Sequence, residues 1–381
     1  MTIPTTSTQF VPGLGGVVAA QTRLSSVNGL EGELIIAGFP LQEIAGKATF
    51  EEMAYLLWHD ALPTAAELKE FREVLASQRQ LPSATLTLLK AAAEQRLPAM
   101  DTLLLGASTL SLDLAKREPT DQAIAILARF PVIVATYARL LNGQEPLSPR
   151  EDLGQAANYL YILFGEVPQP ERVRGLETYL NTVVDHGLNA STFTARVITS
   201  TGSDLVSAVV GAIGALKGPL HGGAPGPALN MVFEIGEASR AEAVMREKLA
   251  RRERLMGFGH RVYRTRDPRA EVLSVAAEKM FQKSGDMALY TLTREVESVA
   301  VRLLAERYPE RNLKTNVEFY TALLLHGLGI STDLFTPTFA ISRVAGWIAH
   351  ILEQRQESRI IRPESEYIGP RDRRWIPLEH R

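Results

Sequence analysis

Residues 257–276 read GFGHRVYRTRDPRAEVLSVA, and this stretch contains both kinds of structure that the sequence predicts. Its first part places glycines on both sides of His260, and such a pattern interrupts a helix. Asp267 followed by Pro268 is typical of an N-cap and a first helical turn. Apolar side chains within 270–276 then recur at helical spacing. The stretch therefore predicts a glycine-rich loop that carries a histidine and leads into a helix.

Helical patterns continue along most of the chain in both directions. Thr49 with Glu52, and Thr64 with Glu67, form capping-box patterns that predict two helix starts. Further helices are expected at 170–185, 190–199, 204–216, 240–255, 287–307, 316–326 and 338–355. A β-like run is seen in GELIIAGF (32–39), which favours a small hairpin near residues 20–40. The fold is therefore expected to be mainly helical.

Length and composition limit the function classes. A chain of 381 residues with 45% hydrophobic and 22% charged residues is expected to form roughly two globular domains. The formal charge of −2 argues against general affinity for nucleic acid or an anionic membrane. The purest apolar run, 205–216, has 12 residues, whereas a bilayer span needs about 20. No targeting segment is visible at the start, so a cytoplasmic protein is expected.

Several classes of site are excluded by missing residues or motifs. The chain has no cysteine, which rules out disulfides, thiolate metal sites and thiol nucleophiles. It also lacks an HExxH helix, a G-x-S-x-G elbow, a Walker A motif and a complete dinucleotide-binding glycine pattern. We therefore expect no metal and no redox cofactor.

Two histidines stand out because each lies in a glycine-rich turn, where a substrate can approach the ring closely. His221 lies in GPLHGGAPGP (218–227), which we expect to be a loop, and His260 lies in the stretch quoted above. Residues 251–270 contain seven arginines against two acids, and arginine is suited to bidentate binding of carboxylate or phosphate. Ordinary loop histidines beside a solvated basic surface would give the same pattern, so both interpretations remain open.

Glu318 is the third candidate. It lies near the start of the strongly apolar helix expected at 316–326. A first-turn glutamate is favoured by the helix dipole alone. A carboxylate in an apolar pocket can instead serve as a general base, because desolvation raises its pKa. The residues themselves do not decide between these two roles.

Five ordered stretches together resemble the citrate synthase family over nearly the whole chain. They are DHGLNAST (185–192), LKGPLHGGA (216–224), MGFGHRVYRTRDPRA (256–270), FTPTFAISRVAGWIAH (335–350) and IIRPESEYIGP (360–370). Members of the family are almost wholly α-helical homodimers that need no metal or redox cofactor. The resemblance therefore implies an all-α fold with a large domain, 1–221 plus 323–381, and a small domain, 222–322.

The resemblance also implies an activity, the condensation of acetyl-CoA with oxaloacetate and water to give citrate and CoA. Glu318 falls on the position of the base that removes the α-proton of the thioester. His221 falls on the position that stabilises the resulting enolate, and His260 on the position that polarises the oxaloacetate carbonyl. These three are the catalytic residues that the resemblance implies.

The resemblance assigns binding roles to further residues. His186, Arg269 and Arg343 fall on oxaloacetate-binding positions. Arg362 matches an arginine that reaches across the dimer into the partner's site. Arg264 falls where the family has a basic residue for the phosphates of CoA.

Three positions depart from the family pattern. Glu318 replaces an aspartate, Pro225-Gly226 replaces the usual Asn-Glu, and Ala37 replaces a common arginine. Alternatives therefore remain: a 2-methylcitrate synthase that uses propionyl-CoA, a catalytically weakened homologue that binds oxaloacetate or CoA, and an acyl-CoA hydrolase. We favour a working citrate synthase, because the histidines and arginines are all retained.

Overall fold

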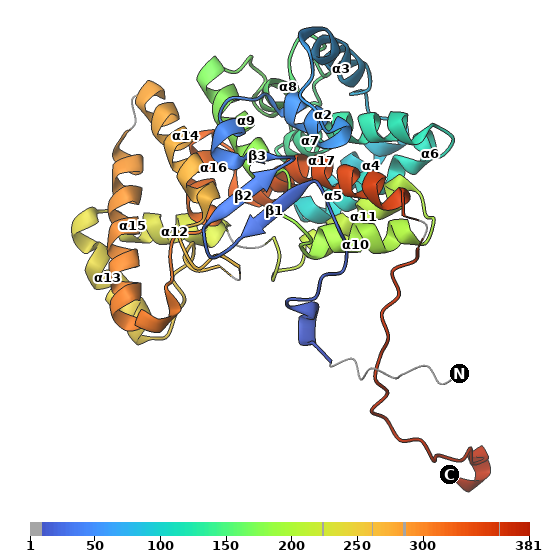
Figure 1. The fold of residues 1–381 in the computed structure, drawn as a ribbon. Helices are drawn as coiled ribbons and strands as arrows, with labels where there is room; N and C mark the ends of the chain where they lie inside the picture. Colours follow the sequence, from blue (N-terminus) through green and yellow to red (C-terminus); the bar gives the residue numbers. More distant parts are fainter. Residues whose placement is uncertain (1–9, 223–224, 261, 285–286, 358) are drawn as a thin grey trace.

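Helices make up most of the molecule, in agreement with the all-α prediction (Figure 1). The computed structural model describes residues 10–222, 225–260, 262–284, 287–357 and 359–381. One antiparallel sheet follows the first 3₁₀ turn, with the order β1-β2-β3. Its strands are β1 (Ser25–Asn28), β2 (Glu33–Ile36) and β3 (Phe39–Pro40). The hairpin expected near residues 20–40 is thus confirmed, with one additional short strand.

The first eleven helices form the larger part of the body. They are α1 (Leu41–Ile44), α2 (Phe50–His59), α3 (Ala65–Ser77), α4 (Ser83–Glu94), α5 (Ala99–Thr109), α6 (Ser111–Leu114), α7 (Pro119–Leu141), α8 (Gln155–Phe164), α9 (Pro170–Val183), α10 (Ala190–Ser200) and α11 (Leu205–Leu216). Both predicted capping boxes form: Thr49 caps α2 together with Glu52, and Thr64 caps α3 together with Glu67. The sequence did not predict the longer helices α4, α5, α7 and α8 or the short helices α1 and α6.

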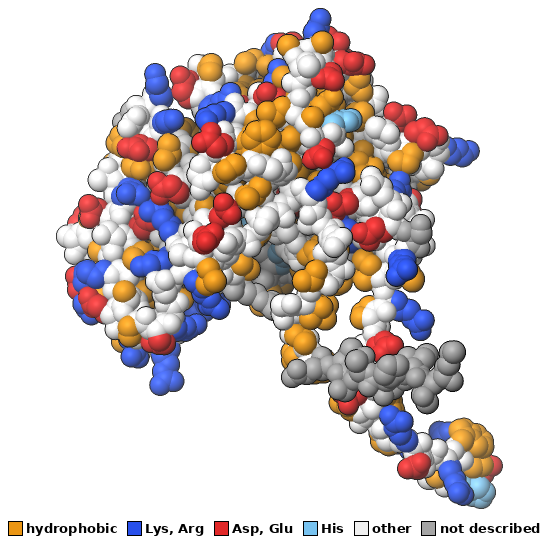
Figure 2. Space-filling view, in the orientation of Figure 1, with side chains coloured by type: hydrophobic (Ala, Val, Ile, Leu, Met, Phe, Trp, Pro, Cys, Tyr) orange, Lys and Arg blue, Asp and Glu red, His pale blue; other side chains and the backbone are white. Residues whose placement is uncertain are grey.

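The remaining helices comprise one group of five and a single long helix (Figure 1). The group α12 (Pro225–Ile235), α13 (Ala241–Ala250), α14 (Pro268–Ser284), α15 (Met287–Arg307) and α16 (Val317–Gly327) gathers on one side. The last long helix, α17 (Phe335–Arg355), returns to the body and packs against α2, α7, α9, α10 and α11. Figure 2 shows that the visible face is hollowed between the two parts, with a histidine inside the hollow. The division into domains at residues 221/222 and 322/323 stays a prediction.

Two sequence predictions need correction. The loop predicted over 218–227 is shorter, because α12 already begins at Pro225. Prolines are tolerated in a first helical turn, where their missing N–H would have no partner within the helix. The helix predicted over 240–255 ends at Ala250, and Arg252 has a φ of 61° that a helix cannot continue through.

Helix α7 is the one helix among the described residues that is long and apolar enough to cross a bilayer. However, 78% of its most apolar window is buried inside the protein, where it contacts α4, α5, α8 and α17. This burial is typical of a core helix.

Candidate active site

The glycine-rich loop before α14 is hydrogen-bonded to the residues before α16. Asn316 donates through its backbone N to Gly257 O at 3.0 Å and through Nδ2 to Gly259 O at 2.9 Å. Gly257 and Gly259 have φ values of 89° and 83°, which favour glycine. These bonds fix the loop that carries His260 relative to the helix that carries Glu318.

Asp267 joins the same two elements at their helix starts. Its Oδ1 accepts a hydrogen bond from Arg269 N at 3.0 Å, which confirms the predicted N-cap of α14. Its Oδ2 accepts one from Val317 N, in the first turn of α16, at 3.2 Å. The same carboxylate binds the Arg269 guanidinium, with 3.0 Å to Nε and 2.8 Å to Nη2. Arg269 is therefore buried with a carboxylate partner and a fixed orientation.

The hydrogen bonds around His260 determine which ring nitrogen carries its proton. Val262 N and Tyr263 N donate to His260 Nδ1 at 3.0 and 3.1 Å. Nδ1 must therefore hold a lone pair, so the neutral ring carries its proton on Nε2. Burial and the nearby Arg269 lower the pKa of His260 to about 4, so the ring is neutral at pH 7. Nε2 lies 3.3 Å from Arg269 Nη2, and these two donors converge on one region that suits an acceptor.

His186 lies beside these groups, as the sequence predicted for a binding residue. Its ring centroid is 5.8 Å from that of His260, and its Nε2 lies 3.1 Å from Tyr263 Oη. Burial, followed by the charges of Arg269 and Arg343, holds the pKa of His186 well below its usual value. Tyr263 is a buried residue of this cluster that the sequence did not indicate. Its ring centroid lies 4.8 Å from that of His260.

Arg343 supplies a second buried guanidinium from α17. Its Nε donates to Val183 O at 2.8 Å, and its Cζ lies 4.5 Å from the Phe339 ring centroid. Burial lowers its pKa to about 10, so it is still charged at pH 7. Among the described residues no carboxylate forms an ion pair with Arg343. Two buried arginines with only one paired carboxylate suit an anionic ligand.

His221 is held from the opposite side by Ser191, at the start of α10. Ser191 N donates to His221 Nε2 at 3.3 Å, and Ser191 Oγ lies 2.9 Å from the same nitrogen. Because a backbone N can only donate, Nε2 is the acceptor and the ring carries its proton on Nδ1. Burial and Arg343 lower the pKa of His221 to about 4. Ser191 is itself fixed by Trp347 Nε1, which donates to its Oγ at 3.1 Å.

Glu318 is half-buried in the first turn of α16, where Asn316 Oδ1 accepts a hydrogen bond from its backbone N at 3.1 Å. Burial raises the pKa of its carboxyl above the usual 4.5, although Arg269 lowers it in part. No hydrogen bond to the carboxylate is recorded within the described part of the chain. A carboxyl group of this kind is suited to accept a proton.

Two predicted residues do not join this cluster within one chain. Arg264 lies on the exposed side of the loop, where its backbone N donates to Gly29 O at 2.8 Å. Arg362 lies exposed in the C-terminal segment, which extends away from the body (Figure 1). Residues 223–224 of the LKGPLHGGA stretch, and Arg261, lie outside the described residues. The individual roles given to all these side chains stay predictions.

The departures from the family pattern have simple local positions. Pro225 and Gly226 form the first turn of α12. Ala37 lies between β2 and β3 with a φ of 44°.

Among the described residues no group of three or more acidic or histidine side chains could hold a metal ion. The expectation that no metal or redox cofactor takes part stays a prediction.

Comparison with known proteins gives one consistent result. A family model described as "Citrate synthase, C-terminal domain" matches residues 13–364. The chain belongs to the citrate synthase family. It is 41% identical to "Citrate synthase 2" of Bacillus subtilis over 97% of this chain and 98% of that protein. It is also 38% identical to a 2-methylcitrate synthase of Shewanella oneidensis, over 97% of each.

The fold agrees with this membership in the citrate synthase family. The structure matches the citrate synthase of Thermoplasma acidophilum with a TM-score of 0.85 and 28% identity, over 96% of this chain and 97% of that one. That structure is a ternary complex with carboxymethyl coenzyme A and oxaloacetate. The chain is therefore an enzyme of the citrate synthase type, an acyltransferase that converts the acyl group into an alkyl group on transfer. These comparisons do not favour a weakened binding homologue or a hydrolase.

Proposed function

We propose that this enzyme condenses acetyl-CoA with oxaloacetate and water to give citrate and CoA. One observation carries the proposal: two neutral imidazoles, each with a defined tautomer, lie in the cluster of the two buried arginines. His221 carries its proton on Nδ1 and His260 carries its proton on Nε2. The condensation needs two such donors, because negative charge develops first on a thioester oxygen and then on a ketone oxygen.

Oxaloacetate fits the cationic half of the cluster. Its two carboxylates would pair with Arg269 and Arg343, of which Arg343 has no ion pair among the described residues. Its ketone oxygen would then accept a hydrogen bond from His260 Nε2, at the place where that donor and Arg269 Nη2 converge. Binding in this way polarises the carbonyl carbon toward attack.

The thioester would be activated by the other pair of groups. Glu318 would remove a proton from the α-carbon, and His221 Nδ1–H would stabilise the enolate oxygen. The α-carbon then forms a bond to the ketone carbon of oxaloacetate, while the C=O π bond breaks and the ketone oxygen takes up a proton to become the hydroxyl of citrate. Water finally attacks the thioester carbonyl of the product, releasing CoA as a thiol and citrate as a carboxylate. Every step uses side chains of the protein, the two substrates and water.

We also propose a homodimer in which Arg362 completes the site of the partner. The terminal arms, residues 10–20 and 359–381, extend from the body in Figure 1. They expose several large apolar side chains, which favours burial against a second copy. These are Phe10, Val17, Val18, Ile360, Tyr367, Ile368, Trp375, Ile376 and Leu378. We further propose that Arg264 binds the phosphates of CoA. A cytoplasmic location is also proposed, and it agrees with the bacterial and archaeal relatives.

A thiol-release assay tests the proposed function. The purified protein is mixed with acetyl-CoA or propionyl-CoA, with and without oxaloacetate, and free CoA is measured. We expect release that depends on oxaloacetate and is faster with acetyl-CoA. Faster release with propionyl-CoA would identify a 2-methylcitrate synthase. Release without oxaloacetate would identify a hydrolase, and binding of oxaloacetate without release would identify a binding protein.

A further inference from the structure

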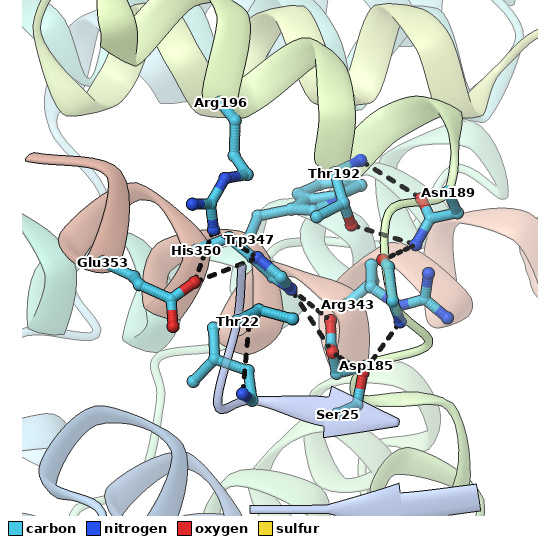
Figure 3. Close-up of polar contacts among 12 residues, drawn as sticks. Thr22, Ser25, Asp185, Asn189, Thr192, Arg196, Arg343, Trp347, His350 and Glu353 are labelled. Atoms are coloured by element: carbon cyan, nitrogen blue, oxygen red, sulfur yellow. Dashed lines mark hydrogen bonds and ion pairs between the residues drawn. The ribbon is translucent and has the colours of Figure 1, made fainter. Parts of the chain in front are cut away.

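A chain of polar side chains, three of them fully buried, lies close to Arg343 (Figure 3). It runs from Asp185 through His350 and Arg196 to Glu353. His350 Nε2 lies 3.2 and 3.3 Å from the two oxygens of Asp185. Arg196 Nη1 lies 3.0 Å from His350 Nδ1 and 2.5 Å from Glu353 Oε2. Asp185, His350 and Arg196 are each 0% exposed, so the proposed chemistry uses none of them directly.

The partners of His350 indicate which tautomer its ring adopts. A guanidinium can only donate, so Nδ1 of His350 accepts from Arg196 and must hold a lone pair. The proton of the neutral ring is therefore on Nε2, where it is donated to Asp185. His350 thus connects a buried cation to a buried anion through one defined tautomer.

Asp185 in turn is bonded to the loop that carries His186. Ser25, on β1, donates from Oγ to Asp185 Oδ2 at 2.5 Å, and its Oγ accepts from Gly187 N at 2.8 Å. Gly187 has a φ of 56°, so the chain turns sharply just after His186. The residues on both sides of His186 are thus held by one carboxylate and one hydroxyl.

Helix α17 packs against the backbone just before His186. Arg343 and His350 lie two turns apart on it, and both bond to the short stretch 183–185. Between them lies Gly346, where a Cβ would stand 2.3 Å from Val184 O and 3.0 Å from Asp185 Oδ1. The helix therefore touches the backbone just before His186 at a distance that only glycine permits.

From these contacts we propose that His350 is a positioning residue for oxaloacetate binding. By donating to Asp185, His350 fixes the position of the His186 loop relative to Arg343. His186 and Arg343 can then contact the same ligand. The inference depends on the proposed function, because it assumes that His186 and Arg343 bind oxaloacetate. It adds a residue that touches no reactant.

Two substitutions of His350 separate its two hydrogen bonds. In His350→Gln the amide reaches the position of Nε2 and can still donate to Asp185. In His350→Asn the shorter amide reaches the position of Nδ1, so it can accept from Arg196 but cannot reach Asp185. We expect His350→Asn to raise the KM for oxaloacetate roughly 10- to 100-fold, as a displacement of about 1 Å can do. The KM for acetyl-CoA at saturating oxaloacetate should stay within about 2-fold of its original value, and His350→Gln should restore most of the oxaloacetate affinity.

Controls separate positioning from general loss of stability. Thr338→Val removes a buried hydrogen bond, 2.9 Å to Tyr159 Oη, from the same helix but away from Asp185. It should lower the melting temperature without changing the KM for oxaloacetate. Ser25→Ala lies at the sheet and removes the other donor to Asp185, so it tests the idea even if His350→Asn fails to fold. We expect it to raise the KM for oxaloacetate several-fold.

The outcomes divide clearly. Equal effects of His350→Asn and His350→Gln, or parallel increases in both KM values, would overturn the positioning role while leaving the proposed function intact. An unchanged KM for oxaloacetate in Ser25→Ala would also count against it. If calorimetry detects no oxaloacetate binding by the unmodified protein, the proposed function itself fails, and the positioning role fails with it.

Discussion

The two halves of the candidate site are held by different kinds of contact. His186 and Arg343 are supported by hydrogen bonds between distant parts of the chain, such as the contact between Asp185 and His350, 165 positions apart. His260 is oriented by the backbone of the next few residues, and Glu318 by its own N-cap. The support of His186 and Arg343 is thus part of the core, whereas His260 and Glu318 lie on a loop and a helix start that are hydrogen-bonded to each other. We expect substitutions behind His186 and Arg343 to act mainly on substrate binding, and substitutions around Glu318 to act mainly on the rate of reaction.

Removing the carboxylate of Glu318 should give the largest effect on rate. In Glu318→Gln no group remains to accept the α-proton, and loss of a general base costs about 10²- to 10⁴-fold. We expect kcat to fall by that amount while oxaloacetate binding, measured by calorimetry, is retained. A near-normal kcat would remove Glu318 as the base. Glu318→Asp is the matched control and should change kcat only modestly in either direction.

A methyl group added at two glycines tests the contrast between the halves directly. A Cβ at Gly257 would lie 2.9 Å from Phe319 Cβ, beside Glu318 in α16. We expect Gly257→Ala to lower kcat roughly 10- to 100-fold through a displacement of Glu318 by about 1 Å. Gly346→Ala would instead push against Val184 O in the core and should destabilise the protein by about 1–3 kcal/mol. Thermal unfolding and steady-state kinetics measured on both variants would show whether the two losses differ in kind.

Ser191→Ala should have a smaller effect, confined to the rate. It removes the hydroxyl between Trp347 Nε1 and His221 Nε2, but the backbone N of residue 191 still donates to the ring. We expect kcat to fall by less than about 10²-fold, the smallest usual cost of losing a catalytic donor outright, with little change in the KM for oxaloacetate. A larger rise in KM than fall in kcat would mean that His221 belongs to the binding half.

The dependence of kcat/KM on pH should identify the groups that titrate. Burial raises the pKa of Glu318 above 4.5, while the pKa values of His221 and His260 are both about 4. As the pH falls, Glu318 should therefore be protonated first, and activity should decrease with a slope of one before the histidines become charged. A slope above one would instead mean that a histidine becomes charged over the same pH range.

Local patterns in the sequence predicted the local structure well. The capping boxes, the Asp267–Pro268 helix start and the glycine turns around His260 depend on neighbouring residues, and the structure confirms them. Helix α7 was not predicted: every residue from Ala125 to Ala138 is buried, so no exposed polar face marks this part of the helix. Ser191 lies within a quoted motif, yet its contact with His221 spans 30 positions and no periodicity signals it.

The same reasoning explains why the residues that support His186 and Arg343 could not be predicted. His350 was one of seven histidines, and its partners Asp185 and Arg196 lie more than 150 positions away. Tyr263 lies three residues after His260, but only the folded loop brings its hydroxyl to His186. Residues that position others through tertiary contacts carry no local signal, so the motifs suggested His186 and Arg343 as binding residues but not the side chains that hold them in place.

A buried carboxyl outside the site gives the smallest expected effect on activity and extends the contrast to stability. Glu177, on α9, is 7% exposed, and burial, reinforced by the neighbouring charge of Glu51, raises its pKa to about 7. Its ion pair with Arg174, at 3.2 Å, offsets this only in part because Arg174 is half exposed. The pKa is higher in the folded than in the unfolded protein. Folding is therefore favoured at low pH, and the free energy of unfolding falls as the pH rises from about 4.5 through 7.

The loss could reach about 3 kcal/mol, since one pKa unit corresponds to about 1.4 kcal/mol. Glu177→Gln removes the titration, so the variant should melt at a higher temperature than the unmodified protein at pH 8. At pH 5 the two should melt alike, and kcat should be unchanged at both pH values. Glu43→Gln, at an exposed site, is the control and should show no such difference. If Glu177→Gln changed kcat, the core and the catalytic half would be coupled more closely than their separate contacts indicate.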